Sequence, residues 1–332
     1  MTDVARLAGV SHQTVSRVLN EHPNVRPQTR ETVLAAISEL GYRPNAAART
    51  LVTRRTRTIG VISFDTTLFG PASMLYAIEG AAQETYFVAI TSLQSLDRSS
   101  VVEAMDRFVG QGVDGIIVIA PLTSGLAALS DCAGDIPLIA VGCGTSAQLT
   151  SLAVDNVEGG ALATRYLLGL GHETVHHIAG PASWLDAYER IAGWRMALQE
   201  AQAPEPALFS GDWSSASGFE IGNQIAADRS VTAVFCANDP MALGMLRALS
   251  EHGRRVPGDV SVVGYDDVPD SAYFLPPLTT VRQNFGELGR RALDALVDLI
   301  NGRDPGALEP VTPRLVVRSS AGPPEMYPVD LS

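Results

Sequence analysis

The stretch HQTVSRVLN, residues 12 to 20, carries side chains that are able to read the edges of DNA bases. Gln13 can form two hydrogen bonds with adenine, Arg17 can form two with guanine, and the ring of His12 can donate or accept one. The apolar residues between them recur at helical spacing, so the polar side chains share one face of a short helix. We therefore interpret this stretch first as a candidate for nucleic-acid recognition.

The charge distribution supports this interpretation, although the chain as a whole is acidic. The 332 residues carry a formal net charge of −12, from 24 basic and 36 acidic residues. Residues 1 to 58 contain nine Arg and four acidic residues, which leaves 15 Arg and 32 acidic residues for the rest. A small basic module joined to a large acidic one is expected when only one end of the chain meets a polyanion.

Residues 1 to 41 are predicted to form three short helices. The first ends at Gly9, the second has Ser11 as its N-cap and runs through Asn20, and the third begins at Pro27 and ends at Gly41. Two helices that meet at a short corner form the helix-turn-helix arrangement, whose second helix enters the major groove. A purely structural bundle is the alternative. The predicted core comprises Val4, Leu7, Val10, Val15, Val18, Val33, Ile37 and Leu40.

A second short element follows in RPNAAARTL, residues 43 to 51. Pro44 and Asn45 start a helix of about seven residues, far below the ~12 to 15 that persist alone in water. We expect this helix to be ordered only when contacts from outside the helix stabilise it.

From Thr58 the sequence alternates between apolar strands and helical segments. The expected strands form two series, TIGVISF, FVAITSL, GIIVIA, PLIAVG and SLAVD, then VHHIAG, ALFSG, AVFCA and VSVVGYD, with RLVVRSS as a last strand. Helical patterns such as SMLYAIEGAAQE and PMALGMLRALSEHG separate many of them. Two alternating series predict two doubly wound lobes, with a ligand cleft at the carboxyl ends of the strands.

Several classes of function are disfavoured by what the sequence lacks. Every basic residue is Arg, and without Lys there is no Schiff-base or P-loop lysine. Cys132, Cys143 and Cys236 have neither zinc-site nor disulfide spacing. No signal peptide and no membrane-spanning run are recognisable. We expect a cytoplasmic protein that has no membrane partner.

Three motifs resemble a cofactor site, a metal site and a catalytic cysteine only weakly. GCGTSA, residues 142 to 147, fits a dinucleotide fingerprint but leaves no room for its helix before the next strand. His172, His176 and His177 look like a metal cluster, but the last two are adjacent in a strand and point to opposite faces. Cys143 lacks an evident His partner. We predict no catalytic arrangement, no metal and no cofactor.

The chain resembles the lactose-repressor (LacI/GalR) family of bacterial transcription regulators. The resemblance covers nearly the whole chain, through DVARLAGVSHQTVSRVLN, RPNAAARTL, GHETVHHIAG, RIAGW, ANDPMALG and DVSVVGYDD followed by PPLTTVRQ. A sugar-responsive subset of the family shares GDWSSASGF and SVVGYDDVPDS. The resemblance implies an all-α helix-turn-helix headpiece and an α/β core of two doubly wound parallel-sheet lobes, like the type I periplasmic binding proteins.

The resemblance also implies the domain boundaries. The headpiece is expected at 1–44, a hinge helix and linker at 45–56, the core at 57–322 and a tail at 323–332. Within the core, the N-lobe would hold about 57–155 and 284–312, and the C-lobe about 156–283 and 313–322. This chain starts about five residues later than the usual beginning of the family pattern, so Met1 and Thr2 replace part of the cap of the first helix. The family's tetramer-forming heptad tail is missing, so a homodimer is implied.

Contacts with a double-stranded DNA operator are expected from the headpiece and hinge. By resemblance, base edges are contacted by His12, Gln13 and Arg17, the DNA backbone by Thr14, Ser16, Asn20 and Asn45, and the minor groove by a Leu51 wedge. Packing of Leu51 in a linker that docks on the core is the alternative.

Eight effector contacts are implied in the cleft. They are the polar Arg190, Asn238 and Asp266, the apolar walls Trp213 and Phe285, and Phe69, Pro71 and Met74 on the opposing lobe. The set suits a neutral sugar, because planar polar groups pair with vicinal hydroxyls while an aromatic ring covers the C–H face. Each residue also has a structural alternative, namely helix capping for Asn238 and Asp266 and core packing for Trp213.

One departure affects the identity of the effector. Gly142 stands where the resemblance leads us to expect a sugar-contacting aspartate. Its absence removes one hydroxyl contact and enlarges the pocket. A galactoside is the leading effector, and a purine or a phosphorylated sugar is the alternative.

Taken together, these features predict a sequence-specific repressor whose operator affinity falls when a sugar binds in the cleft. Binding that instead strengthens with the small molecule would mark a corepressor-type member. Two rivals come from other classes, an exported sugar-binding protein and an enzyme that uses Asp266 and Asp267.

Overall fold

The computed structural model describes residues 1–19, 22, 24–42, 55–94, 97–122, 136–142 and 149–324. The chain forms two compact units, Met1–Thr56 and Arg57–Ser332. None of the helices in these ranges is long and apolar enough to cross a membrane.

The first unit contains the three predicted helices, α1 (Thr2–Leu7), α2 (His12–Leu19) and α3 (Pro27–Glu39). Ser11 starts α2 as predicted, because its Oγ accepts a hydrogen bond of 3.1 Å from the backbone N–H of Thr14. Four predicted core residues, Val4, Val15, Val18 and Val33, are buried.

Two of the predicted core residues are instead exposed. Leu7 is 46% exposed and Leu40 is 45% exposed, while the smaller Ala5 and Ala36 are buried. In so short a bundle the helices approach closely, so small side chains fill the contact and the larger ones at the helix ends project past it.

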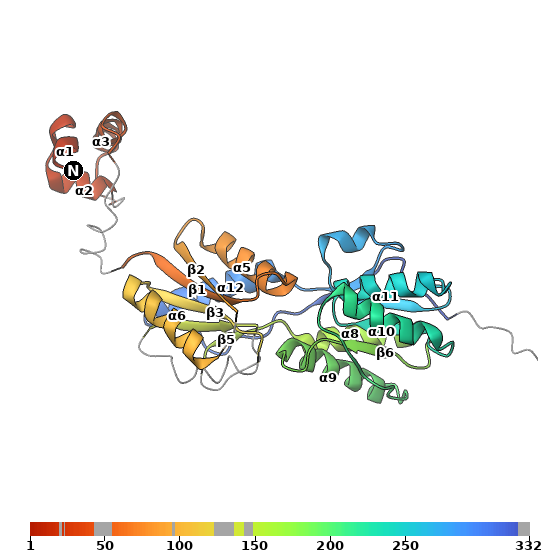
Figure 1. The fold of residues 1–332 in the computed structure, drawn as a ribbon. Helices are drawn as coiled ribbons and strands as arrows, with labels where there is room; N and C mark the ends of the chain where they lie inside the picture. The colour runs from red at the N-terminus through yellow and green to blue at the C-terminus, as the bar shows by residue number, and fades with distance from the viewer. Residues whose placement is uncertain are drawn as a thin grey trace, which may run out of the picture. The chain divides into compact units, whose positions relative to one another are not determined.

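The second unit begins with a lobe built on a parallel sheet in the order β2-β1-β3-β4-β5, here called the N-lobe. Its strands are β1 (Thr58–Phe64), β2 (Phe87–Leu93), β3 (Gly115–Ile119), β4 (Leu138–Val141) and β5 (Ser151–Leu152). Figure 1 shows α6 (Arg98–Gln111) on one face, with α5 (Phe69–Ala82) and α12 (Phe285–Ile300) on the other. Because α12 comes from late in the sequence, the chain returns to this lobe after building the next one.

The other lobe, here called the C-lobe, has a sheet in the order β11-β10-β9-β8-β6-β7, parallel except between β10 and β11. Its strands are β6 (His176–Ala179), β7 (Phe209–Ser210), β8 (Ala233–Cys236), β9 (Ser261–Asp266), β10 (Thr279–Arg282) and β11 (Arg314–Val316). One face packs on α8 (Asn156–Gly169) and α9 (Leu185–Glu200), and the other on α10 (Ser215–Ala227) and α11 (Asp239–Glu251). A short 3-10 helix, η1 (Pro269–Tyr273), follows β9.

The observed architecture confirms the predicted fold class, an all-α headpiece followed by an α/β core of two doubly wound lobes. Two elements were not identified from the sequence. The helix α8 has Gly159 and Gly160 near its start, which weakens the helical pattern, and β10 is only four residues long.

The chain passes between the lobes three times, after β5, between β10 and α12, and before β11. Two of these crossings lie side by side, because Val154 and Val311 form a parallel β-bridge. Short paired segments of this kind allow the two lobes to rotate while the sheets stay intact.

The contact between α8 and α9 leaves no room for a side chain at Gly193. A Cβ there would lie 1.9 Å from the carbonyl oxygen of Val157. We predict that Gly193→Ala lowers the free energy of unfolding by at least ~1 to 3 kcal/mol, because backbone must move apart to accept it.

Urea denaturation followed by circular dichroism measures this loss, and Gly169→Ala is the matched control. Gly169 ends α8, and no atom beyond its chain neighbours and the adjoining backbone of α8 lies within 4 Å of the position that a Cβ would take there. The control is therefore expected to match or slightly exceed wild-type stability. A Gly193→Ala protein as stable as wild type would contradict the packing described.

Candidate functional site

The surface of α2 presents the residues predicted to contact bases. His12, Gln13 and Arg17 are exposed, while Val15 and Val18 on the opposite face are buried in the headpiece core. The helix is therefore held by its apolar face and offers its polar face outward, as a recognition helix does.

The residues predicted to contact the DNA backbone are only partly described. Thr14 and Ser16 are half-buried, and the Thr14 hydroxyl lies 2.9 Å from that of Ser11 at the start of α2. Asn20, Asn45 and Leu51 lie outside the described residues.

A cavity of about 480 Å³ in the second unit, here called the core cavity, is lined by both lobes. All eight predicted effector residues line it, although they are spread over more than two hundred positions of sequence. They are Phe69, Pro71, Met74, Arg190, Trp213, Asn238, Asp266 and Phe285. The other lining residues are Thr67, Leu68, Gly70, Ala72, Trp184, Asp186, Pro240 and Gln283.

The two walls of the core cavity differ in chemistry. The first turns of α5 and α12 supply an apolar wall, in which the Phe69 and Phe285 rings meet edge to face at 6.0 Å between centroids. On the C-lobe, Trp184 and Trp213 meet edge to face at 5.6 Å. The charged groups of the cavity come from the C-lobe.

Arg190 of α9 is the centre of the polar wall. Only 3% of its surface is exposed, yet three separate contacts position it. Its Nε donates to the Oδ1 of Asn156 at 2.9 Å, its Nη1 donates to the carbonyl of Ala237 at 2.6 Å, and its guanidinium lies 3.7 Å from the centroid of the Tyr265 ring. A buried arginine held in this way has a fixed orientation before any ligand binds.

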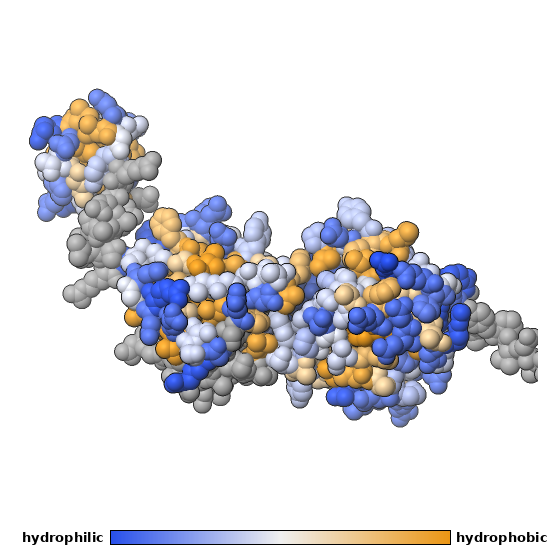
Figure 2. All heavy atoms as spheres, in the orientation of Figure 1, coloured by the Kyte–Doolittle hydropathy of each residue, from blue (hydrophilic) through white to orange (hydrophobic). Residues whose placement is uncertain are grey.

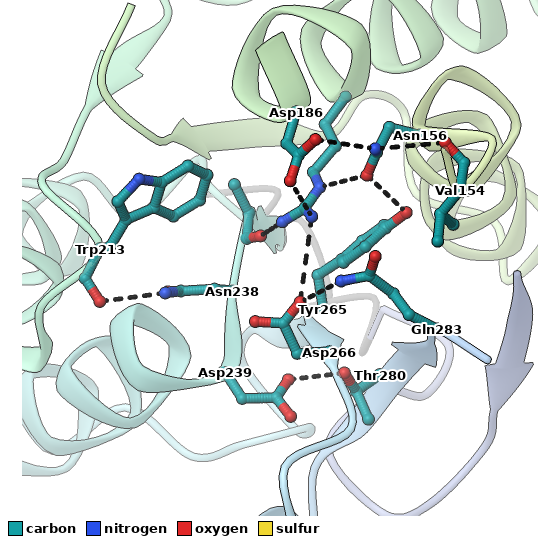
Figure 3. A network of polar contacts seen from close by, with 12 residues as sticks. Val154, Asn156, Asp186, Trp213, Asn238, Asp239, Tyr265, Asp266, Thr280 and Gln283 are labelled. Carbon is teal, nitrogen blue, oxygen red and sulfur yellow. Dashed lines mark hydrogen bonds and ion pairs between the residues drawn. The ribbon is translucent and has the colours of Figure 1, made fainter. Parts of the chain in front are cut away.

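Asp266 ends β9 in an unusual backbone conformation, with φ of 104°. Its Oδ1 accepts a hydrogen bond of 2.7 Å from the Nε2 of Gln283 and lies 3.9 Å from the Nη2 of Arg190. Burial raises the pKa of the Asp266 carboxyl to about 6, against the opposing effects of Arg190 and Gln283. Figure 3 shows Asp266, Gln283 and Asn156 converging on this network.

Asn238 and Trp213 have structural roles as well as places on the cavity wall. Asn238 caps α11, since its Oδ1 accepts from the backbone N–H of Met241 at 2.9 Å, and its Nδ2 donates to the carbonyl of Trp213 at 3.0 Å. Trp213 is 7% exposed and belongs to the C-lobe core. Asn238 therefore caps a helix and Trp213 packs in the core, as the structural alternatives predicted, and both residues also line the cavity.

Sequence reasoning missed four residues of this network, namely Asn156, Asp186, Tyr265 and Gln283. Asp186 lies four positions before Arg190, a spacing that places both on one helix face and was available in the sequence. Asn156 had no comparable signal, because it begins the helix that the sequence analysis did not identify.

Gly142 is not among the described residues that line the core cavity. It directly follows β4 with φ of +74°, a conformation that favours glycine, and a Cβ there would lie 3.3 Å from the Cε of Met74. Met74 does line the cavity. An apolar side chain thus faces the cavity in the region where a carboxylate was expected.

Metal binding finds no support in the described ranges, where no group of three or more His, Cys, Asp or Glu is placed to hold an ion. His172 is instead buried against the hydroxyl of Ser261 and the carbonyl of Gly322, at 3.1 Å and 3.0 Å. His177 is fully buried and stacks on Phe235.

Comparisons with known proteins define the class of the protein. A family model described as bacterial regulatory proteins of the lacI family matches residues 1–45, and a periplasmic binding protein-like domain model matches residues 164–321. The chain belongs to the lacI family of bacterial regulatory proteins, and is a DNA-binding transcriptional repressor with a ligand-binding core.

Individual relatives match over nearly their whole length. The lactose operon repressor of Escherichia coli K12 is 38% identical over 91% of this chain and 84% of its own. A PurR transcriptional repressor of Haemophilus influenzae is 34% identical over 96% of this chain and 97% of its own.

Solved structures give the same result. The lac repressor dimer bound to operator and the anti-inducer ONPF has a TM-score of 0.84 at 36% identity, over 96% of this chain and 98% of that one. A complex of the regulator CelR with cellobiose has a TM-score of 0.71 at 35% identity, with the same coverage.

The raised pKa of Asp266 predicts a specific pH dependence of stability. The unfolded chain loses this proton near the ordinary value of 3.8, and the folded protein only near 6. From about pH 4 to about pH 6, wild type should therefore lose stability relative to Asp266→Asn as the pH rises.

The measurement is urea unfolding of both proteins, without added sugar, at several pH values in this window. The difference between the two free energies of unfolding removes the contribution of groups that do not interact with Asp266, while Asp239, whose pKa burial and Asp266 both raise, still contributes to it. A difference that stays constant with pH would contradict the assignment.

Proposed function

We propose that this protein is a homodimeric repressor whose affinity for its operator is lowered by a neutral sugar bound in the core cavity, with a galactoside as the leading candidate. The observation that carries the proposal is the two-sided cavity. Arg190, Asn238 and Asp266 offer donors and acceptors on one side, and aromatic and aliphatic side chains cover the other. A pyranose has the same division between its hydroxyl edge and its C–H faces.

The charge of the cavity favours a neutral ligand over a phosphorylated sugar. Among the described residues that line it, Asp186 and Asp266 carry carboxyl groups and Arg190 carries the only positive charge. A phosphate placed beside them would meet two carboxyl groups and one guanidinium that is already hydrogen-bonded.

A purine effector is the second candidate. It draws support from the relatives named PurR and from the aromatic side chains in the cavity wall, since a flat base stacks on such rings. The sugar proposal draws support from the CelR complex with cellobiose and from the similarity to the lactose operon repressor.

The rivals from other classes find less support. A headpiece that matches the lacI family model is not expected in an exported sugar-binding protein. For an enzyme, Asp267 is poorly suited as a base. Although burial acts to raise its pKa, hydrogen bonds from Arg318 and Arg282 lower it below the usual range.

The mechanism we propose couples the cavity to the hinge. A sugar that contacts both walls favours one angle between the lobes, and β1 of the N-lobe follows directly on the segment that joins the core to the headpiece. A change in that angle would remove the support of the hinge helices proposed at residues 45–56. Coupling of ~1 to 3 kcal/mol is usual for such linkage.

Homodimerisation fits an exposed apolar face of the N-lobe. Tyr76 on α5 is 79% exposed, and Ile90 on β2, the edge strand, is 46% exposed. Figure 2 shows hydrophobic side chains gathered in the region of α5 and β2. A dimer carries two headpieces, which suits an operator with two half-sites about 34 Å apart, one turn of the duplex.

The decisive experiment starts by selecting an operator from a pool of random duplexes with the purified full-length protein. Gel shifts on this operator are then measured with lactose, methyl β-galactoside, cellobiose, guanine and glucose 6-phosphate. We expect a neutral sugar to weaken operator binding by roughly 5- to 150-fold, the range of ordinary allosteric coupling.

The control is Arg17→Ala, which should bind the operator ~5- to 150-fold more weakly through loss of a base contact and leave binding to random DNA nearly unchanged. Release by guanine or glucose 6-phosphate alone would replace the sugar proposal. An affinity that rises with the sugar would reverse the sign of the mechanism.

The dimer face is tested by charge introduction. We predict that Tyr76→Glu combined with Ile90→Glu converts the dimer to a monomer in sedimentation-velocity runs, because burying two carboxylates across an apolar contact is costly. Operator affinity should fall with it, since two linked headpieces bind more tightly than one.

Val109→Glu is the matched control, because Val109 is 54% exposed but lies on α6, at the other face of the sheet. It should remain a dimer. A double variant that also sediments as a dimer would place the interface elsewhere.

A further inference from the structure

We propose that Asp186 is an effector-binding residue that supplies, from the C-lobe, the carboxylate that Gly142 does not supply from the N-lobe. This inference rests on the proposed sugar-binding function and adds to it a residue that determines specificity. It concerns a position that neither the family resemblance nor the sequence motifs singled out.

The position of Asp186 directs its side chain to the core cavity. It is the second residue of α9, and it lines the cavity together with Arg190, four residues further along the same helix. Its side chain is 17% exposed, against 3% for Arg190, so it keeps access to the space that a ligand would fill. Figure 3 shows Asp186 beside Asn156 at the edge of the polar network.

One oxygen of Asp186 is fixed and the other is not. Its Oδ1 accepts a hydrogen bond of 3.2 Å from the Nδ2 of Asn156. Its Oδ2 accepts no hydrogen bond from the residues that the structure describes, and its nearest cation, the Nη2 of Arg190, is 3.7 Å away. A carboxylate held by one oxygen and open at the other is prepared to accept a hydrogen bond from a ligand hydroxyl.

The Nη2 of Arg190 is likewise not hydrogen-bonded to either carboxylate. It lies 3.7 Å from Asp186 and 3.9 Å from Asp266, and both distances exceed hydrogen-bond length. A ligand hydroxyl near this nitrogen can accept from the guanidinium and donate to either carboxylate. Of two adjacent ligand hydroxyls, one could donate to Asp186 and the other to Asp266, while both accept from the Nη2 of Arg190. This arrangement suits a vicinal diol.

The opposing wall explains why a carboxylate is needed on the C-lobe. Of the described N-lobe residues that line the cavity, only Thr67 has a polar side chain. Met74 faces the cavity near Gly142, where a carboxylate was expected. The sugar would thus be bound through its hydroxyls by the C-lobe, and the N-lobe would close over it with apolar contacts.

The test uses Asp186→Asn in the full-length protein, with Glu189→Gln as the matched control. Glu189 lies one turn further along α9, where burial and then the nearby charge of Asp186 raise its pKa, and it does not line the cavity. Both variants change a carboxyl to an amide on the same helix. Calorimetric titrations with lactose, methyl β-galactoside and cellobiose give the affinities.

We expect Asp186→Asn to weaken binding of a sugar that wild type binds by ~10- to 100-fold, the usual effect of losing a hydrogen bond to a charged group. Glu189→Gln should stay within ~3-fold of wild type. Circular dichroism and a cooperative urea transition check that both variants fold. If Asp186→Asn is poorly folded, Asp186→Ser removes the same charge with a smaller side chain.

A second measurement distinguishes a direct contact between Asp186 and the sugar from an indirect structural effect of Asp186. Monodeoxy derivatives of methyl β-galactoside should show that wild type discriminates against loss of one particular hydroxyl, and that Asp186→Asn no longer does. Equal affinity of Asp186→Asn and wild type, or discrimination that is unchanged at every hydroxyl, would overturn the role of Asp186 while leaving the sugar proposal standing. Failure of wild type to bind any of the three sugars would overturn the sugar class itself, and this assignment with it.

Discussion

The burial of one guanidinium is the constraint on which the ligand-binding core depends. Arg190 is almost inaccessible to water, so protein groups must compensate its charge. These groups come from four parts of the C-lobe, namely Asn156 of α8, Asp186 of α9 itself, the carbonyl of Ala237 and the end of β9. Satisfying one side chain in this way fixes the positions of two helices and two strand ends around a single cavity. Arg190 itself lines that cavity, and its Nη2 lies beyond hydrogen-bond length from the carboxyl groups of Asp186 and Asp266.

This network also joins the cavity to the crossings between the lobes. Asn156 follows Val154 by two residues, Val154 is bridged to Val311 on a second crossing, and Gln283 lies on the third, between β10 and α12. The polar wall is therefore built at the segments about which the lobes would rotate, and the apolar wall lies beyond them on α5 and α12. In the proposed mechanism, a ligand that contacts both walls would change the energetic balance of the crossings, as coupling to the headpiece requires.

Much of this architecture follows from local sequence patterns. The buried strands are short apolar runs, and the headpiece helices carry turn or capping signals at Gly9, Ser11, Pro27 and Gly41. Motif likeness placed eight residues that all line the core cavity. Prediction failed where the local signal was weak or misleading. The glycines that allow α8 to pack against α9 also hid α8 as a helix, and the long side chains of Leu7 and Leu40 indicated burial that close packing of the small bundle does not allow.

The sequence by itself determined the class of fold, the basic recognition helix and the identity of most cavity residues, because these depend on periodicity, charge and motifs that are local in the chain. Only the tertiary structure decided that Asn156, Asp186 and Arg190 form one network, that Asp186 lines the cavity, and that Met74 lines it near Gly142. Those facts depend on distances between residues far apart in the chain, and such distances are set by the packing of helices and sheets, which no local pattern encodes.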